Sequence, residues 1–413
     1  MCKRNSPSSY EIRLLTVALL AFLGCVTPMQ TEAQQWTFEP VIRAGAEYDD
    51  NIRLRPDDDN VVDSGSLSLD GIGAIVRRSQ SSEVKFIPRV RLRDFVEQEV
   101  EDLDDYFLDF FGRKETLKGS FGLQVRLSQE NILRAEIENR DFDNPDVIDP
   151  IDIDTGQIRV GDVQERGNVS AFFNRSLTER VGFGLSARYL DVSYDGTSDL
   201  QDFSSAALRT ELTLQSSQRS VWALGAFGGE FESEDETNFN ESQTTGIDIG
   251  YRYRVGERTE LRASAGYQNV KTDSTRNGVV RDFEDDLTVF ELTWIRSGET
   301  SRLVANVSQS VDAGGFGSLQ KRTQFRVRYT TALSQRVNAR IEGRLQTIEP
   351  SGVQNPIDRD FSRIRVALER RLSRAWSIEG SYTFTSQEFS DQNTDSKSNA
   401  VALAVVFEPR RPQ

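Results

Sequence analysis

The sequence predicts an all-β protein, a transmembrane antiparallel up-and-down β-barrel of about 18 strands, with 16 strands as the alternative count. Three observations predict this fold. The chain opens with a secretion signal, its body alternates apolar and polar residues, and tight turns alternate with long acidic connections. Strands that have one apolar face and one polar face, joined by connections of unequal length, are typical of transmembrane barrels.

The amino terminus has the features of a secretory signal peptide. Lys3, Arg4 and Arg13 form a positive segment, and an apolar run over 14–26 follows it. This run is too short to cross a bilayer as a helix, which argues against a membrane anchor of that kind. Thr31-Glu32-Ala33 then places small residues at the two positions that a signal peptidase reads.

We therefore assign residues 1–33 to a signal peptide and residues 34–413 to the barrel, with short periplasmic turns and long acidic extracellular loops. Cys25 offers an alternative, a lipoprotein site. Phe22 stands three residues before this cysteine, however, where such sites usually have Leu.

Residues 34–413 lack the side chains from which the common catalytic centres are built. The chain has no His, and both of its Cys and both of its Met precede residue 34. His and Cys supply most nucleophiles, proton shuttles and metal ligands. We therefore expect no enzymatic activity, no catalytic residue, no cofactor and no metal site. The sequence has no glycine-rich phosphate loop and no basic nucleic-acid face, so no nucleic acid is expected as a partner.

Connections of two kinds define the two ends of the predicted barrel. Tight polar turns are expected at 78–83, 115–118, 177–180, 216–219, 255–258, 297–300, 334–336 and 372–375. Long connections rich in Asp, Asn and Glu are expected at 49–62, 97–105, 141–163, 191–202, 230–244, 273–286, 349–360 and 390–396. Because short connections of outer-membrane barrels are periplasmic, we expect the Gram-negative outer membrane, with both termini on the periplasmic side.

Period-two alternation assigns the faces of each strand. Val401, Leu403, Val405 and Phe407, for example, form one apolar row. Aromatic residues that end such rows fit the interfacial girdles of a membrane barrel; they are Tyr189, Tyr251, Tyr253, Trp294 and Tyr329. The alternative is a soluble antiparallel sandwich, but so many long strands in one soluble sheet are uncommon.

Arginines recur on the polar faces of four predicted strands. Lipid rejects such charges by about 2–4 kcal/mol each near the mid-plane, so they are expected to face the lumen. The candidate lumen-lining residues are Arg89, Arg91, Arg326, Arg328, Arg340, Arg344, Arg363 and Arg365. A basic lumen favours anions. The alternative is a lumen neutralised by ion pairs, since further carboxylates are expected to point inward; they are Glu211, Asp248, Glu291, Glu342 and Glu369.

Two motifs carry a resemblance to a known family. The opening strand over 38–48 is followed directly by Asp49-Asp50-Asn51-Ile52, and Asp104-Asp105-Tyr106-Phe107-Leu108-Asp109 follows later. With these motifs, residues 34–413 resemble the outer-membrane barrels of exopolysaccharide biosynthesis and export systems. The resemblance implies a conduit or accessory for polysaccharide export, with the polysaccharide and periplasmic export components as partners.

Two other functions stay open on the sequence. One is a structural or adhesive surface barrel whose lumen is closed by its own charges, and the other is a porin for small solutes. Membrane lipid and lipopolysaccharide are expected partners in each case, with divalent ions bridging the acidic loops loosely to lipopolysaccharide. No segment matches the loop pattern of a specific calcium site of the EF-hand type.

The assigned cleavage site gives a first prediction. The mature protein is expected to begin at Gln34 without a lipid and to fractionate with the outer membrane, because the site at Thr31-Glu32-Ala33 is better formed than the site at Cys25. Mass spectrometry of the purified protein checks this. An acylated Cys25 as the first residue would contradict it.

Overall fold

The computed structural model describes the chain over the ranges 35–55, 61–96, 103–132, 163–195, 200–234, 238–276, 279–315, 317–350, 358–390 and 392–409. Contacts divide the chain into Met1–Gln35 and Trp36–Gln413, and the second unit is the barrel. The predicted signal peptide and Gln34 lie outside the described residues. Among the described residues, no helix is long and apolar enough to cross a membrane.

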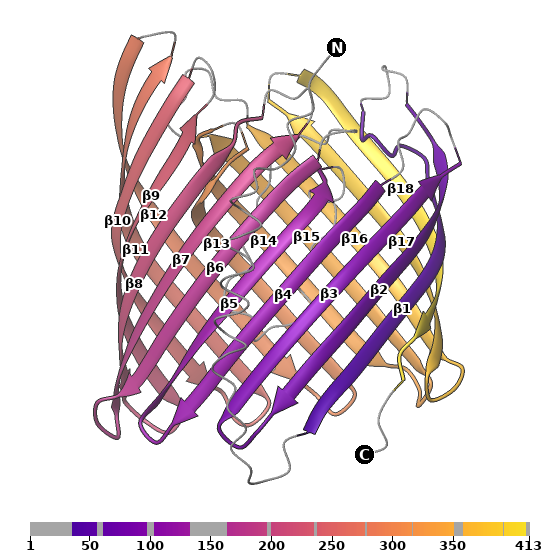
Figure 1. Ribbon diagram of the computed structural model, residues 1–413, viewed down its shortest axis with the longest axis horizontal. Helices are drawn as coiled ribbons and strands as arrows, with labels where there is room; N and C mark the ends of the chain where they lie inside the picture. The colour runs from indigo at the N-terminus through magenta and orange to yellow at the C-terminus, as the bar shows by residue number, and fades with distance from the viewer. Residues whose placement is uncertain are drawn as a thin grey trace, which may run out of the picture. The chain divides into compact units, whose positions relative to one another are not determined.

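The described chain forms one 18-stranded sheet in which consecutive strands pair antiparallel and β18 pairs with β1 (Figure 1). The strands are β1 Gln35–Asp49, β2 Ser64–Arg78, β3 Ser82–Phe95, β4 Leu103–Thr116, β5 Gly119–Asn131, β6 Val163–Ser176, β7 Val181–Asp195, β8 Phe203–Gln215, β9 Ser220–Glu234, β10 Asn238–Arg254, β11 Thr259–Arg276, β12 Val279–Ser297, β13 Ser301–Ala313, β14 Leu319–Ala332, β15 Val337–Pro350, β16 Arg359–Arg371, β17 Trp376–Phe389 and β18 Gln392–Phe407. The all-β class and the count of 18 are confirmed, and the alternative of 16 strands is wrong.

The barrel has two distinct ends. Tight connections lie at the end where β1 begins and β18 finishes, which we call the turn end; the opposite end is the loop end (Figure 1). Each of the eight tight turns predicted from the sequence falls between two observed strands. The up-and-down order of an even number of strands places the two ends of the described chain together at the turn end.

The outer face of the wall is apolar. On β18, Val401, Leu403 and Val405 are 57%, 61% and 41% exposed, whereas Ala404 of the opposite face is buried. Other strands around the barrel repeat this arrangement with large exposed side chains, which include Leu208, Leu212, Trp222, Leu224, Ile247, Ile249, Leu292, Trp294, Ile341, Leu345, Ile364, Val366 and Leu368. A soluble protein rarely exposes so large an apolar surface, so the soluble sandwich is excluded and the outer face fits lipid.

Aromatic side chains cluster on this outer face near the turn end. The rings of Trp222 and Tyr251 lie 4.5 Å apart between centroids, and Tyr251 stacks with Tyr253 at 6.2 Å. At the closing strand, Trp376 lies 4.8 Å from Phe407. Amphipathic rings of this kind concentrate at the boundary between hydrocarbon and water.

The seam between β1 and β18 closes the barrel. Its backbone ladder runs from Ile42 opposite Phe407 to Asp49 opposite Ala400. Closure is required because an unpaired strand edge would leave backbone N–H and C=O groups without partners in lipid. The seam therefore determines whether the wall is continuous.

Side chains extend the seam beyond its ladder at the loop end. Asp50 accepts hydrogen bonds from the backbone N–H and from Nδ2 of Asn399, at 2.6 and 2.8 Å. Asp49 accepts one from Ser398 Oγ at 2.7 Å, and Asn51 Nδ2 donates to a backbone carbonyl of β18 at 2.9 Å. The motif Asp49-Asp50-Asn51 is thus a fastening between the first and last strands.

Strands β10, β11 and β12 are the longest, with 17, 18 and 19 residues. Strand β18 has 16 residues, and every other strand has at most 15. Together with β9, the three longest strands run through most of 230–244 and 273–286, and β18 runs through most of 390–396. The acidic composition assigned these three segments to loops, and that assignment is wrong for them. Most of the acidic side chains alternate along the strands and point outward, as Glu284 does in its exposed pair with Lys271. At about 3.3 Å per residue, the additional residues carry the sheet above the apolar belt, where water solvates these charges.

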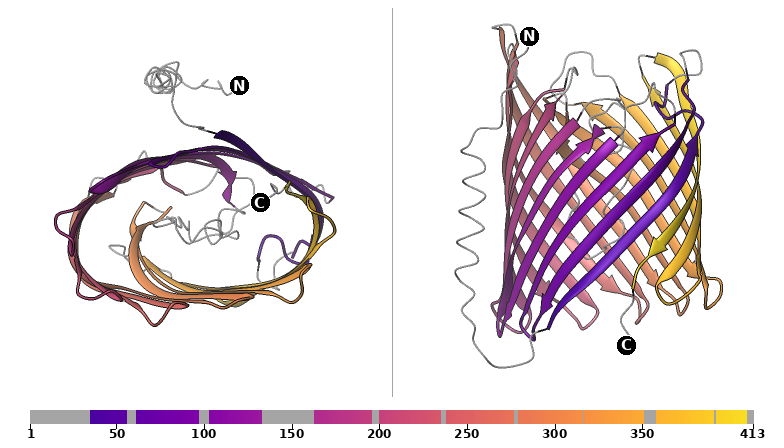
Figure 2. Two further views of the ribbon diagram at one scale, coloured as in Figure 1. Left: turned by 90° about the horizontal axis from the view of Figure 1, so that it is seen from below. Right: turned by 45° about the vertical axis from the view of Figure 1, so that its right-hand side comes forward.

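The wall divides near the loop end between β12 and β13. Their pairing begins at Ser297 opposite Arg302 and stops at Phe290 opposite Gln309, so the upper half of β12 pairs with β11 alone. Above this point β13 separates from β12. Strands β13 and β14 stay paired with each other, β14 stays paired with β15, and the sheet bends here into the lumen, as the orange strands in the left view of Figure 2 show. The connection over 314–318, which contains no charged residue, was not among the loops predicted from the sequence.

The seam gives a second prediction. Asp50→Ala is expected to lower the free energy of unfolding by about 1–3 kcal/mol, because it removes an ionised acceptor from two hydrogen-bond donors of Asn399. The fraction of protein that keeps its heat-sensitive gel mobility across a urea series measures this.

Asp395→Ala is the matched control, on β18, the strand that Asp50 contacts. The ion pair of Asp395 with Lys397 is about half exposed on both sides, so no measurable change is expected. Equal urea midpoints for Asp50→Ala and the parent protein would show that the fastening does not contribute to stability.

Candidate functional site

The interior face of the barrel is the candidate site, because the outer face is apolar and the polar side chains point inward. The eight predicted arginines lie on β3, β14, β15 and β16, on the face opposite the exposed apolar residues. Arg91, Arg326 and Arg344 are 5%, 7% and 6% exposed. Whether these residues act on a transported solute stays a prediction.

Three arginines form a row across adjacent strands. Arg326 of β14 lies opposite Arg344 of β15, and Arg344 lies opposite Arg363 of β16. Adjacent strands are about 4.8 Å apart, so three guanidinium groups share one level of the wall. Like charges directly opposite one another are destabilising unless they are compensated. None of the three is without a partner, and the Arg344 guanidinium also lies 5.5 Å from the ring centroid of Phe361.

Glu379 is the hub of a second cluster, near the turn end. This carboxylate is 5% exposed and contacts Arg43 at 2.7 Å, Arg365 at 3.0 Å and Arg340 at 3.2 Å. The four side chains come from β1, β15, β16 and β17, so the cluster ties together strands on both sides of the seam. Arg328 has its own counter-charge, because its Nε donates to Glu342 at 2.8 Å.

A third cluster lines β3. Arg89 forms a forked pair with Asp70 at 2.9 and 2.5 Å, and Arg93 donates to Glu47 at 3.0 Å. Arg91 lies 3.9 Å from Asp70. The guanidinium groups of Arg89 and Arg91 also lie 5.6 and 5.7 Å from the ring centroid of Phe107. The cations of β3 are therefore held on the wall by carboxylates and by an aromatic face.

The carboxylates expected to point inward have polar partners. Glu342 pairs with Arg328, while Glu211 and Asp248 both pair with Arg209. Glu291 accepts hydrogen bonds from the side chains of Thr293 and Asn306, and Glu369 accepts one from Asn338. Three of the five carboxylates thus have a cationic partner, which supports local neutralisation there, whereas the hydrogen bonds of Glu291 and Glu369 come from neutral groups.

The hub role of Glu379 and the pairing of Asp70 were missed by sequence reasoning. Alternation places both carboxylates on the polar face, which is the signal that could have indicated them. The signal does not reveal which arginines they meet, because Arg43 and Glu379 are 336 positions apart in sequence. Closure of the barrel alone brings these two together.

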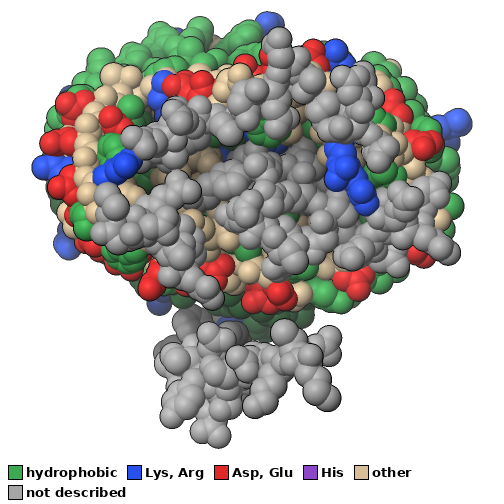
Figure 3. All heavy atoms as spheres, turned by 90° about the horizontal axis from the view of Figure 1, so that it is seen from above, with side chains coloured by type: hydrophobic (Ala, Val, Ile, Leu, Met, Phe, Trp, Pro, Cys, Tyr) green, Lys and Arg blue, Asp and Glu red, His purple; other side chains and the backbone are tan. Residues whose placement is uncertain are grey.

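The rim of the loop end carries both signs of charge. Seen from above, the described part of the mouth shows Asp and Glu side chains beside Lys and Arg side chains (Figure 3). Among the described residues, no group of three or more Asp, Glu, His or Cys side chains could hold a metal ion.

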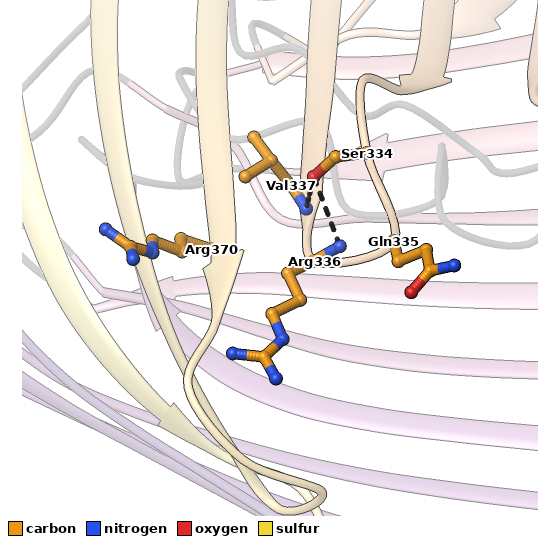
Figure 4. A pocket seen from close by; sticks show the side chains of 5 residues that line it. All are labelled: Ser334, Gln335, Arg336, Val337 and Arg370. Atoms are coloured by element: carbon orange, nitrogen blue, oxygen red, sulfur yellow. Dashed lines mark hydrogen bonds between the residues drawn. The ribbon is translucent and has the colours of Figure 1, made fainter.

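A small surface hollow lies at the turn end, beside the turn between β14 and β15. Ser334, Gln335, Arg336, Val337 and Arg370 line it (Figure 4). The Ser334 hydroxyl accepts hydrogen bonds from the backbone N–H groups of Arg336 and Val337, at 3.3 and 3.1 Å, so it serves the turn itself. We regard this hollow as a feature of the turn, separate from the lumen.

Comparisons with known proteins return structures but no family. No family model and no curated protein matches the sequence. The chain is similar to the unliganded ferric citrate transporter FecA, with 9% identity and a TM-score of 0.46 over 87% of this chain and 61% of that chain. It is also similar to the ferric preacinetobactin receptor BauA from Acinetobacter baumannii, with 8% identity and a TM-score of 0.44 over 90% of this chain and 81% of that chain.

A third match is the copper transporter OprC, with 10% identity and a TM-score of 0.47 over 92% of this chain and 66% of that chain. This chain thus spans less than two thirds of the lengths of FecA and OprC. Identities this low concern the fold alone, and the fold is that of an outer-membrane β-barrel.

The expectation of exopolysaccharide export is corrected by these comparisons. The matched barrels are named as transporters or receptors for iron complexes and copper, and the predicted role as an export conduit or accessory is wrong. The structure also supplies a different reason for the motif on which the resemblance rested, since Asp49-Asp50-Asn51 fastens the seam. A seam fastening says nothing about a polysaccharide.

The Glu379 cluster gives a third prediction. Glu379→Gln is expected to lower the free energy of unfolding by about 2–3 kcal/mol, because it leaves three guanidinium groups around a neutral amide. This is below the usual cost of breaking a fully buried pair, since the arginines are about one-third exposed. Urea titration followed by gel mobility measures the change.

Glu299→Gln is the matched control at the turn end. Its carboxylate pairs with Arg258 on the exposed surface, so the same chemical change is expected to leave the urea midpoint where it was. If Glu379→Gln behaves like this control, the cluster does not stabilise the barrel.

Proposed function

We propose that this chain lets small anionic solutes cross the outer membrane through its lumen. One observation carries the proposal, the imbalance of charge on the interior face of β14–β16. On the described part of that face, two carboxylates, Glu342 and Glu369, stand against a set of nine arginines. These are Arg322, Arg326, Arg328, Arg340, Arg344, Arg359, Arg363, Arg365 and Arg371.

Fixed positive charge on one wall of a lumen lowers the energy of an anion along that wall. Rings of Arg or Lys are the usual means by which pores select anions. A guanidinium group also matches the geometry of carboxylate and phosphate groups, to which it donates two parallel hydrogen bonds. Because the cations on this wall already have partners, each contact with a passing anion replaces an existing one. Such contacts release their ligand easily, which conduction requires.

The orientation of the barrel is part of the proposal. We place the turn end, and with it the first and last strands, on the periplasmic side, because short connections face the periplasm in outer-membrane barrels. The loop end then meets lipopolysaccharide and the medium. Its mixed rim would give both signs of solute access to the mouth, and discrimination would occur deeper, at the arginine wall.

A structural barrel is the second candidate, and one observation favours it. All three arginines of the row have partners, and cations paired in this way would act as the cross-links of a closed lumen. The two candidates differ in conductance. A structural barrel conducts no ions, whereas a solute pathway does.

The fourth prediction tests the pathway. In a planar bilayer with a salt gradient, the folded protein is expected to conduct and to show a reversal potential that favours anions. The triple variant Arg326→Gln, Arg344→Gln, Arg363→Gln is expected to lower the ratio of anion to cation permeability towards one, because it removes the row of fixed charge.

The matched control is Arg180→Gln, Arg258→Gln, Arg336→Gln, which removes the same charge from exposed turns. It is expected to keep most of the anion preference. Absence of conductance in the folded parent protein would overturn the proposal in favour of the structural barrel. Equal selectivity of the two triple variants would show that the arginine row is not the selective element.

A further inference from the structure

The connection between β13 and β14 departs from the behaviour of an ordinary loop, because it is buried. Every residue over 313–320 whose exposure the structure describes is buried. Connections normally run over the surface, since buried backbone polar groups need partners. We call the described residues 313–315 and 317–319 the tip of the β13–β14 hairpin.

Residues of other strands bond to the backbone of the tip. The backbone N–H of Gln201 donates to the carbonyl of Gly315 at 2.9 Å. Asn240 Nδ2 donates to the carbonyl of Gly317 at 2.7 Å. Gln201 precedes β8 and Asn240 lies on β10, so two carbonyls of the tip are bonded by strands three to five positions away along the wall. The tip is docked by specific contacts.

Gly317 is the position at which the backbone of the tip lies against Gln201 and Ser233. Its φ of +70° is one that L side chains rarely adopt, and a Cβ at this position would overlap Gln201 Oε1 and lie 2.6 Å from Ser233 Oγ. Ser233 in turn donates to Gln201 at 3.1 Å. A glycine is therefore required for the tip to reach this depth.

An apolar cluster fills the space between the tip and the wall. Its buried members are Leu190, Val192, Phe203, Phe231, Val270, Ala313 and Leu319. Two of them, Ala313 and Leu319, belong to the tip, and the others come from β7, β8, β9 and β11. The Phe203 and Phe231 rings lie 5.5 Å apart between centroids. Apolar packing therefore adds to the hydrogen bonds that dock the tip.

The docked tip crosses one side of the mouth directly, like a chord of a circle, between β13 and β8. Going along the wall from β13 to β8 passes five strand spacings, which is about 24 Å at about 4.8 Å per strand. The tip spans between these strands directly, and the left view of Figure 2 shows the hairpin inside the ring of strands. The apolar cluster occupies the region behind the chord. Among the residues that the structure describes, the rest of the rim lies on the side of β14–β18 and β1–β6.

We infer that the docked tip of the β13–β14 hairpin sets the width of the solute path at the loop end, with Asn240 and Gly317 as the residues that fix its position. The inference rests on the proposed function for the existence of a path, whereas the docking itself does not. Loss of the docking contacts frees the tip and widens the mouth. Solutes that the docked tip excludes then enter.

The first arm of the test measures docking without any conductance. Both cysteines of the chain precede residue 34, so Ser318→Cys introduces the single thiol of a chain cleaved as predicted. Ser318 is 8% exposed and lies in the tip. Its labelling by a membrane-impermeant maleimide in the folded barrel is expected to be slow. Adding Asn240→Ala is expected to raise the rate about fivefold, the effect of losing one net hydrogen bond on an opening equilibrium.

The second arm measures the path by single-channel conductance in a planar bilayer. Asn240→Ala and Gly317→Ala are each expected to raise the conductance above that of the parent protein. The control for the glycine is Gly256→Ala, because Gly256 also has a positive φ of +81° but a Cβ there meets no atom within 4 Å. The control for the asparagine is Asn269→Ala, whose amide donates to Glu284 and Asp286 on the outward face.

The outcomes separate the two proposals. Faster labelling together with higher conductance supports the inference. Unchanged labelling of Ser318→Cys in the Asn240→Ala background overturns the docking role of Asn240, and faster labelling with unchanged conductance overturns the narrowing. Equal effects of Gly317→Ala and Gly256→Ala overturn the role of Gly317. If the parent protein and every variant lack conductance, the solute pathway fails, and the narrowing fails with it, while the labelling still decides whether the tip is docked.

Discussion

The structure depends on one constraint, that no backbone polar group may be left unpaired within lipid. A sheet can meet this constraint only by closing on itself, because each free edge would expose a row of N–H and C=O groups. The pairing of β1 with β18 supplies the closure, and it joins segments that are more than 340 positions apart at Asp50 and Asn399. Every feature of the lumen is attached to this closed wall.

Closure also determines where the charges go. Once the apolar face meets lipid, alternation sends Arg, Asp and Glu into a confined interior, where an isolated charge is costly. The interior meets this cost with clusters that join several strands, of which the Glu379 hub is the clearest example. The clusters do not balance evenly around the ring. Among its described residues, the inner face of β14–β16 has more arginines than carboxylates. This asymmetry makes that side of the lumen more positive than the rest.

Near the loop end the rule of the wall is inverted. In the apolar belt, strands present apolar side chains outward and polar side chains inward. Higher up, β9 and β11 present Glu232 and Lys271 outward, while Phe231 and Val270 are buried inside. Water surrounds this part of the sheet, so polar side chains face outward and apolar side chains are buried, as in a soluble protein. An apolar core can therefore form here. The core forms inside the mouth, and it is the surface on which the β13–β14 tip is docked.

The sequence by itself determined the closed β architecture, the number of strands and the positions of the tight turns. Alternation and turn chemistry are local properties, so they can be recognised in short stretches of sequence. It also indicated the polar face on which Arg326, Arg344 and Arg363 lie. Tertiary structure alone decided which charges meet, since the partners of Glu379 come from strands that adjoin only after closure. The role of Asp49-Asp50-Asn51 was likewise hidden, because its partners lie at the other end of the chain. The inward tip escaped sequence analysis for the same physical reason: a short uncharged connection gives no local sign of the distant strands against which it packs.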